Sequence, residues 1–321
     1  MLLSFDETVK KINEGGLLHI SGTQTLLEKL PKGNWLGGTG EHFMGADGGV
    51  VTKELFFVTP MPYETYKIQT YTADTIKNIV VDGYDNGFTV IILPYGSAIA
   101  AEYALNNNNY EDMYMRPIAG WVAGRNINNP EQIPKVGNGQ LGEIYEDKGV
   151  AVHIQLPKDQ VASVNIVNIF SPNADFPVLE FEDQDFIIYN CLVNGEKKPF
   201  ADFLKEYNVS SMAPMIGDYS GAEVNISIVQ VLEDGGVQLG APPAKGIKYR
   251  WATPEADYAG AFQSHAKELE GKNIAFACNC LYNFMYGQLE GKQIPVFAGP
   301  ATWGEIAYKL VNQTFVYVAI D

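Results

Sequence analysis

The chain contains 321 residues, with 22 Lys and Arg against 38 Asp and Glu, which gives a formal net charge of −16. Hydrophobic residues make up 46% of the sequence, enough to bury a sizeable core and to exclude intrinsic disorder. So acidic a chain repels phosphate backbones, which excludes nucleic acid as a partner.

Three observations predict a cytosolic protein with no membrane partner. The three cysteines are too few, and odd in number, for a disulfide framework. No apolar run approaches the roughly 20 residues of a membrane helix, residues 90–93 being typical of the longest. Asp6 and Glu7 stand where a signal peptide needs positive charge, so no leader is expected.

The first half alternates strand-like and helix-like segments. Residues 54–59 and 88–93 predict buried strands, because both runs are short, apolar and bounded by Gly or Pro. Residues 72–81 place apolar side chains on one helical face, and residues 97–105 predict a second helix. Residues 141–156 predict a strand pair joined by a turn at residues 146–149.

The second half carries stronger local signals. Residues 186–193 predict a strand, and Pro199 opens a helix with apolar residues at helical spacing. Residues 224–239 predict a hairpin around an Asp-Gly pair, and residues 254–269 predict a helix. Further strands are expected over residues 273–278, 295–298 and 313–320.

The predicted fold class is α+β, with two α/β halves whose mixed, largely antiparallel sheets are flanked by helices. Turn residues and clustered acids over residues 171–185 interrupt the pattern. We therefore predict two domains, residues 1–175 and 176–321. The same stretch also fits a loop that crosses between two packed layers.

A Gly-rich stretch over residues 37–49 is the first candidate for chemistry. It lacks the Gly-Lys-Ser/Thr of a P-loop and any lysine for phosphate, so it predicts a tight turn and a flexible loop. Its glycines would also let a small ligand approach the main chain. His42 lies in this stretch and is the histidine placed best to meet a ligand.

The Cys278-Asn279-Cys280 run leaves four interpretations open. One C-x-C without a second pair is a weak metal signal, and a thiol nucleophile would need a nearby imidazole. Two small buried residues on one face of a strand end are the simplest interpretation. A thiol in a ligand pocket is the fourth.

Two further histidines and one acid complete the candidates. His153 alternates with apolar residues, which predicts a solvated position, whereas His265 falls on the apolar face of its helix and predicts a core histidine. Glu305 stands among apolar neighbours next to Trp303. It predicts either a charge at a helix start or a pocket carboxylate.

With these residues in view, the chain resembles the FIST family of sensory domains, which have an N-terminal and a C-terminal part. The motifs are IAFACNC from Ile274, IPVFAGPATWGEIAY from Ile294 and VNQTFVYVAI from Val311, with WLGGT from Trp35 in the first half. The chain departs from the family where an arginine commonly follows the cysteine by three residues, because Leu281 or Asn283 stands there. This departure puts an anionic ligand in doubt.

The resemblance implies ligand sensing by a stand-alone member, with a small-molecule ligand that is amino-acid-like, or haem as in some members, and a separate signalling protein as partner. The residues themselves leave the cofactor unknown and predict no metal site. The predicted ligand-binding residues are Gly38, Thr39, His42, Cys278, Asn279, Cys280, Trp303 and Glu305.

Two alternatives stay open beside this hypothesis. One is a thiol-dependent hydrolase or transferase that uses Cys278 or Cys280. The other is a haem sensor, which would need an axial ligand such as His42 or His265 in an apolar slot.

Overall fold

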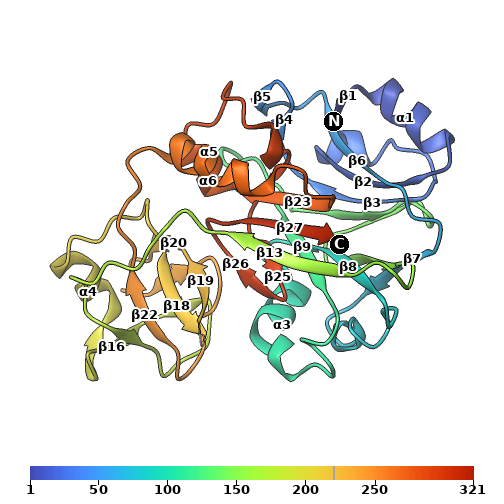
Figure 1. Cartoon of the computed structure of the whole chain (residues 1–321). Coiled ribbons are helices and arrows are strands. Elements are labelled where there is room, and N and C mark those ends of the chain that lie inside the picture. Colours follow the sequence, from blue (N-terminus) through green and yellow to red (C-terminus); the bar gives the residue numbers. More distant parts are fainter. Residues whose placement is uncertain (220) are drawn as a thin grey trace.

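The computed structural model describes residues 1–219 and 221–321, and in these residues the chain forms five β-sheets (Figure 1). Three six-stranded sheets, here numbered 1 to 3, make a main body that carries both termini. A further six-stranded sheet 4 and a three-stranded sheet 5 lie beside it with helix α4 and form a lateral module. No helix in the described residues is long and apolar enough to cross a membrane.

Sheet 1 has the strand order β1-β6-β2-β3-β10-β11, and β2 and β3 run parallel. Ser4 and Glu7 form a capping box that begins the first helix, whose Ile12 packs on the outer face of the sheet. The strands are β1 (Leu2–Leu3), β6 (Phe56–Met61), β2 (Leu17–Gly22), β3 (Trp35–Thr39), β10 (Val136–Asn138) and β11 (Glu143–Tyr145), and the helices are α1 (Phe5–Asn13) and α2 (Gln24–Leu27).

Sheet 2 has the order β26-β25-β9-β8-β12-β7, and β8 and β9 run parallel. Ser97 caps the helix that covers its outer face. The strands are β26 (Lys309–Val311), β25 (Glu305–Ala307), β9 (Ile118–Ala123), β8 (Gly87–Pro94), β12 (Gly149–Gln155) and β7 (Tyr66–Tyr71). The helices are α3 (Ala98–Asn106) and the short 3-10 turns η1 (Ile76–Asn78) and η2 (Asn107–Asn109).

Sheet 3 has the order β13-β27-β23-β24-β4-β5, and β23 and β24 run parallel. Phe262 and Phe284, from two helices, pack in the same apolar cluster as Phe315 of this sheet. The strands are β13 (Ala162–Val167), β27 (Phe315–Ile320), β23 (Ile274–Cys280), β24 (Gly299–Thr302), β4 (His42–Gly45) and β5 (Gly48–Val51). The helices are α5 (Tyr258–Leu269), α6 (Leu281–Tyr286) and η3 (Pro295–Phe297).

The lateral module joins sheet 4, of order β17-β16-β14-β22-β18-β19, to sheet 5, of order β15-β21-β20. The strands of sheet 4 are β17 (Glu196–Pro199), β16 (Asn190–Val193), β14 (Leu179–Glu180), β22 (Lys248–Trp251), β18 (Met215–Tyr219) and β19 (Ala222–Ile226). Sheet 5 contains β15 (Ile187–Ile188), β21 (Val237–Leu239) and β20 (Ile228–Val231), and the helix is α4 (Phe200–Glu206).

One apolar core lies between the three sheets of the main body. Leu36 of sheet 1, Val90 of sheet 2 and Phe276 of sheet 3 belong to the same buried cluster. Strands from the end of the sequence pair with strands from its first half. β25 pairs with β9, and β24 pairs with β4. Sheets 2 and 3 therefore contain strands from both sides of residue 175, and the division of the chain at that residue remains a prediction.

The α+β class is confirmed, and in the described residues only three strand pairs are parallel. The predicted strands at residues 54–59, 88–93, 273–278 and 313–320 form as β6, β8, β23 and β27. The helix predicted at residues 97–105 forms as α3, and the Asp-Gly pair joins β20 to β21.

Four local predictions are wrong. Residues 72–81 make a single 3-10 turn, and the strand predicted at residues 295–298 is another. The strand predicted at residues 186–193 divides into β15 and β16, which belong to different sheets. Residues 141–156 do not pair with themselves, because β11 pairs with β10 whereas β12 lies between β7 and β8.

The Gly-rich stretch is also not a flexible loop. It forms β3 and the β4–β5 hairpin, and its glycines allow close packing. A Cβ atom at Gly49 would lie 2.2 Å from the Leu289 carbonyl oxygen, and one at Gly38 would lie 2.8 Å from Ile92.

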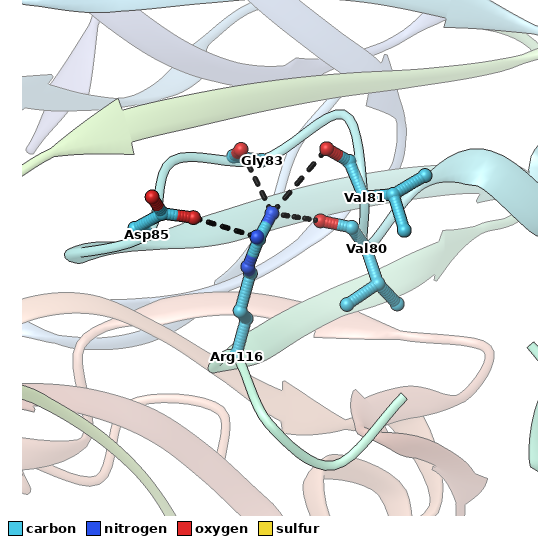
Figure 2. Close-up of polar contacts among 5 residues, drawn as sticks. All are labelled: Val80, Val81, Gly83, Asp85 and Arg116. Atoms are coloured by element: carbon cyan, nitrogen blue, oxygen red, sulfur yellow. Dashed lines mark hydrogen bonds and ion pairs between the residues drawn. The ribbon is translucent and has the colours of Figure 1, made fainter. Parts of the chain in front are cut away.

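Arg116 closes the loop that follows η1 (Figure 2). Its Nη1 donates to the carbonyl oxygens of Val80, Val81 and Gly83 at 2.9, 3.3 and 3.0 Å, and its Nη2 pairs with Asp85 at 2.7 Å. The Asp85 side chain is 96% exposed, so this ion pair contributes little, whereas the carbonyls of Val81 and Gly83 have only this guanidinium to replace water.

We expect Arg116→Met to lower the free energy of unfolding by about 1–3 kcal/mol, because it leaves the partly buried Gly83 carbonyl without a donor. Asp85→Ala should stay within about 0.5 kcal/mol of the parent. Urea denaturation of both variants measures the difference. An equal loss in the two would assign the stabilisation to the ion pair instead.

Candidate functional site

A cavity of about 490 Å³ lies where the main body meets the lateral module. A larger depression of about 1050 Å³ runs beside β13, but it is more open and none of the predicted site residues lines it. The main body contributes Tyr95, Arg125, Ile127, Cys280, Leu281, Tyr282, Met285, Thr302, Trp303 and Asn312 to the cavity, and the module contributes Val229, Gln230, Gln238 and Gly240.

The cavity lies at the carboxyl ends of parallel strands. Tyr95 follows β8 and Arg125 follows β9, the parallel pair of sheet 2. Cys280 ends β23 and Thr302 ends β24, the parallel pair of sheet 3. Loops beyond the carboxyl ends of parallel strands are the usual position of ligand sites in α/β proteins.

The third parallel pair reaches the same place through Thr39, which ends β3. The Thr39 hydroxyl donates to the Gly124 carbonyl at 2.6 Å, and the Gly124 N–H donates to the Thr39 carbonyl at 2.9 Å. A Cβ atom at Gly124 would lie 1.7 Å from the ring of Trp303. Gly124 is therefore the point at which strand ends from all three sheets of the main body meet.

Arg125 brings a positive charge to the cavity. Its guanidinium lies 5.6 Å from the ring centre of Trp303 and donates to the carbonyl of Pro130. No carboxylate pairs with it in the part of the chain that the structure describes. The other two arginines of the sequence, Arg116 (Figure 2) and Arg250, are each held by at least two backbone carbonyls, so Arg125 retains the most free donors.

Asn312 adds a second set of donors. Its side chain is 2% exposed, and its Oδ1 accepts the backbone N–H of Ser227 at 3.2 Å. Its Nδ2 group has no acceptor within hydrogen-bond distance among the described residues, although it borders the cavity. A nearly buried amide with free N–H groups favours a ligand that carries acceptors.

Behind the cavity wall, Glu305 is fully buried. Its Oε2 accepts the N–H and the hydroxyl of Thr314 at 3.2 and 2.8 Å, and its Oε1 lies 3.2 Å from the Thr302 hydroxyl. Burial raises the pKa of Glu305 to about 8, and hydrogen bonds from Thr314, Cys280 and Thr302 limit the rise.

The hydrogen-bond geometry agrees with a protonated Glu305. The single proton of the Thr302 hydroxyl has the carbonyl oxygens of Asn279 and Gly304 within 3.1 Å, besides Glu305 Oε1. A protonated Glu305 can donate to Thr302, which then donates to one carbonyl. In this arrangement the Glu305 carboxyl and the Thr302 hydroxyl each donate one hydrogen bond at neutral pH, and a backbone carbonyl is the last acceptor.

The structure places only some of the predicted site residues at the cavity. Cys280 and Trp303 line the cavity, and Glu305 and Thr39 lie directly behind its wall. The sequence reasoning missed Arg125 and Tyr95, which no local motif marks, and Asn312, which stands in the VNQTFVYVAI motif but was not among the predicted site residues.

The remaining predicted residues face elsewhere. Cys278 is buried, with its thiol 3.3 Å from the Gly120 carbonyl oxygen. Asn279 accepts the N–H of Cys280, Gly38 packs against Ile92, and His42 lies edge-on to Phe284. None of these four residues lines the cavity.

The histidine predictions need correction. His153 is fully buried between the hydroxyls of Tyr71 and Thr89, because both faces of β12 are covered, and burial lowers its pKa to about 3. His265 is partly exposed beside Glu268, since its side of α5 borders the open depression. No histidine lines the cavity in the described residues, and no group of three His, Cys, Asp or Glu there is placed to hold a metal.

We expect Glu305→Gln to change the pH dependence of stability. The folded pKa of about 8 lies above the unfolded value near 4.5, so the folded parent loses stability as the pH rises from about 4.5 to about 8. A glutamine mimics the neutral acid, so the variant does not lose this stability. The unfolding free energy of the variant minus that of the parent should therefore rise by about 1.4 kcal/mol per pH unit over that range.

Urea denaturation from pH 5 to pH 9 measures this difference, which should level off above pH 8. A constant difference across the range would show that Glu305 is ionised throughout.

Comparison with known proteins gives a family but no function. A search of curated proteins finds no match to this sequence. A model described as a family of unknown function, DUF6976, matches residues 3–321. Since this match covers almost the whole chain, the protein belongs to the DUF6976 family.

Proposed function

We propose that the protein is a small-molecule-binding, sensory protein of the FIST type, and that its ligand is an organic anion with a planar apolar body. The observation that carries the proposal is the guanidinium of Arg125, which lies over Trp303 at the cavity without a carboxylate partner in the described chain. Binding an anion would neutralise this charge in a site that water reaches only partly.

The polar lining favours an anion over an amino acid. Arg125 and Asn312 offer N–H donors, and the hydroxyls of Tyr95 and Tyr282 are hydrogen-bonded to no other side chain in the described residues. No Asp or Glu belongs to the lining, so the ammonium group of an amino acid would meet no carboxylate. Of the amino-acid-like ligand that the FIST resemblance implies, the lining therefore fits the carboxylate group and not the ammonium group.

The apolar lining supports a flat ligand body. The rings of Tyr95 and Trp303 are 4.8 Å apart between centres and tilted by 55°, and Met285 and Val229 complete the apolar surface. A volume of about 490 Å³ is within the usual range for small-molecule sites. Aromatic carboxylates fit both the charge and the shape of this lining.

The position of the cavity supports a sensory role. Its walls come from the main body and from β20 and β21 of the module, so one ligand would contact both parts. Such a ligand would stabilise the arrangement in which the two parts close on it. The proposal includes a separate signalling protein that binds the chain in this arrangement.

The test compares phenylacetate with phenylacetamide, which has the same skeleton without the charge, and with phenylalanine. Isothermal titration should give phenylacetate the lowest dissociation constant. A ligand at 100 times its dissociation constant should raise stability by about 2.7 kcal/mol, which a melting curve detects.

Arg125→Met should weaken phenylacetate binding by at least about ten-fold, because the carboxylate loses a charged donor. Lys248→Met is the matched control, since it removes one positive charge from an exposed position outside this cavity. Equal binding of acid and amide, or equal weakening in the two variants, would contradict the proposal.

A further inference from the structure

Cys280 differs from the other two cysteines because it alone borders the cavity. Cys191 lies in the core of the lateral module, and the Cys278 thiol points to a backbone carbonyl in sheet 2. Cys280 is 3% exposed and lines the cavity together with Arg125 and Asn312. A ligand held by these two donors would lie in the same cavity as a thiol.

The surroundings of the Cys280 thiol fit proton transfer. Burial raises its pKa well above the usual range, so the resting group is a thiol. The nearby Glu305 carboxyl raises the pKa of this thiol further, whereas the backbone amides of Gln313, Tyr282 and Asn283 lower it. Thr302 connects Glu305 to the cavity, because its hydroxyl lies 3.2 Å from Glu305 and its side chain belongs to the lining.

We propose that Cys280 adds reversibly to the carbonyl carbon of an oxo carboxylate whose carboxylate is bound by Arg125. This inference rests on the proposed function and names the ligand class of that site. It is carried by the cavity that Cys280, Thr302 and Arg125 share and by the Glu305 carboxyl, which lies 3.2 Å from the Thr302 hydroxyl.

The addition balances without an oxidant or a leaving group. The sulfur–carbon bond forms while the electron pair of the carbonyl π bond moves to its oxygen. The thiol proton passes to Glu305, and Glu305 releases its own proton through the Thr302 hydroxyl, which turns from a backbone carbonyl to the ligand oxygen. The product is a hemithioketal or hemithioacetal, and reversal of the same steps releases the ligand.

A pair of probes isolates the carbonyl group. 2-Oxo-4-phenylbutanoate and 4-phenylbutanoate share the carboxylate and the ring and differ only at carbon 2. We expect the oxo acid to bind at least about ten-fold more tightly, a difference of about 1.4 kcal/mol. With carbon 2 labelled by ¹³C, its NMR signal in the complex should move from the ketone region to that of a tetrahedral carbon bound to sulfur.

Cys280→Ala should abolish both the tetrahedral signal and the preference for the oxo acid, while 4-phenylbutanoate still binds. Cys278→Ala is the matched control, because it removes an equally buried thiol two residues away that does not border the cavity. Melting curves verify that both variants fold, and the labelled ligand tests the parent protein even if Cys280→Ala does not.

The outcomes separate this inference from the proposed function. If both acids bind with equal affinity through Arg125 and carbon 2 stays trigonal in the parent, the inference is wrong and the proposed function stands. A tetrahedral signal that persists in Cys280→Ala also overturns it. If neither acid binds, the proposed function fails, and the inference fails with it.

Discussion

The meeting of strand ends at Gly124 is the constraint on which the cavity depends. Parallel strands put their carboxyl ends on the same side, and here one parallel pair from each sheet of the main body ends at this point. Thr39 holds Gly124 through two hydrogen bonds, and Trp303 packs where a Cβ atom would lie. Trp303 in turn provides the surface over which Arg125 lies. A side chain at Gly124 would therefore displace Trp303 and, with it, the position of the guanidinium.

Segments from two distant parts of the sequence meet at Gly124, one after β9 and one after β24. This meeting explains why sheets 2 and 3 both contain early and late strands. After β24 the backbone leaves sheet 3 and enters sheet 2 as β25, and Trp303 donates its N–H to the carbonyl of Val122 at this crossing. Glu305 follows directly and bonds back to Thr314, which precedes β27 of sheet 3. Its buried carboxyl thus joins two sheets, and the cost of burying it is reduced because it is held in the neutral form.

Local patterns were sufficient where one segment determines its own structure. The apolar run of β8, the Ser97 cap of α3 and the Asp-Gly turn of sheet 5 each carry their signal within a few residues. The same reasoning failed at residues 72–81, whose apolar side chains fit against sheet 2 from a single 3-10 turn, while the carbonyls that follow bind Arg116. It failed at His153 because periodicity cannot tell that both faces of a strand are covered.

The site was predictable to a similar extent. Cys280, Trp303 and Glu305 stand in runs whose mixture of turn, polar and apolar residues is visible in the sequence. Arg125 carries no such mark, because it follows a glycine in a polar loop and acquires its role only through contact with Trp303 from the far end of the chain. The arginine missing three residues after the cysteine therefore does not leave the cavity without a cation.

The net charge of −16 makes this cation more informative than it would be in a basic protein. Most of the acidic side chains are exposed, and their repulsion of an anion is screened over about 8–10 Å of salt solution. A guanidinium beside an aromatic ring, in a cavity without Asp or Glu, acts through a lower dielectric at contact distance and so outweighs that distant repulsion. Under the proposed function, the exposed carboxylates disfavour anions around them, whereas the lining of this cavity holds no Asp or Glu. Charge distribution, and not total charge, would therefore provide, under the proposed function, selectivity for one bound anion.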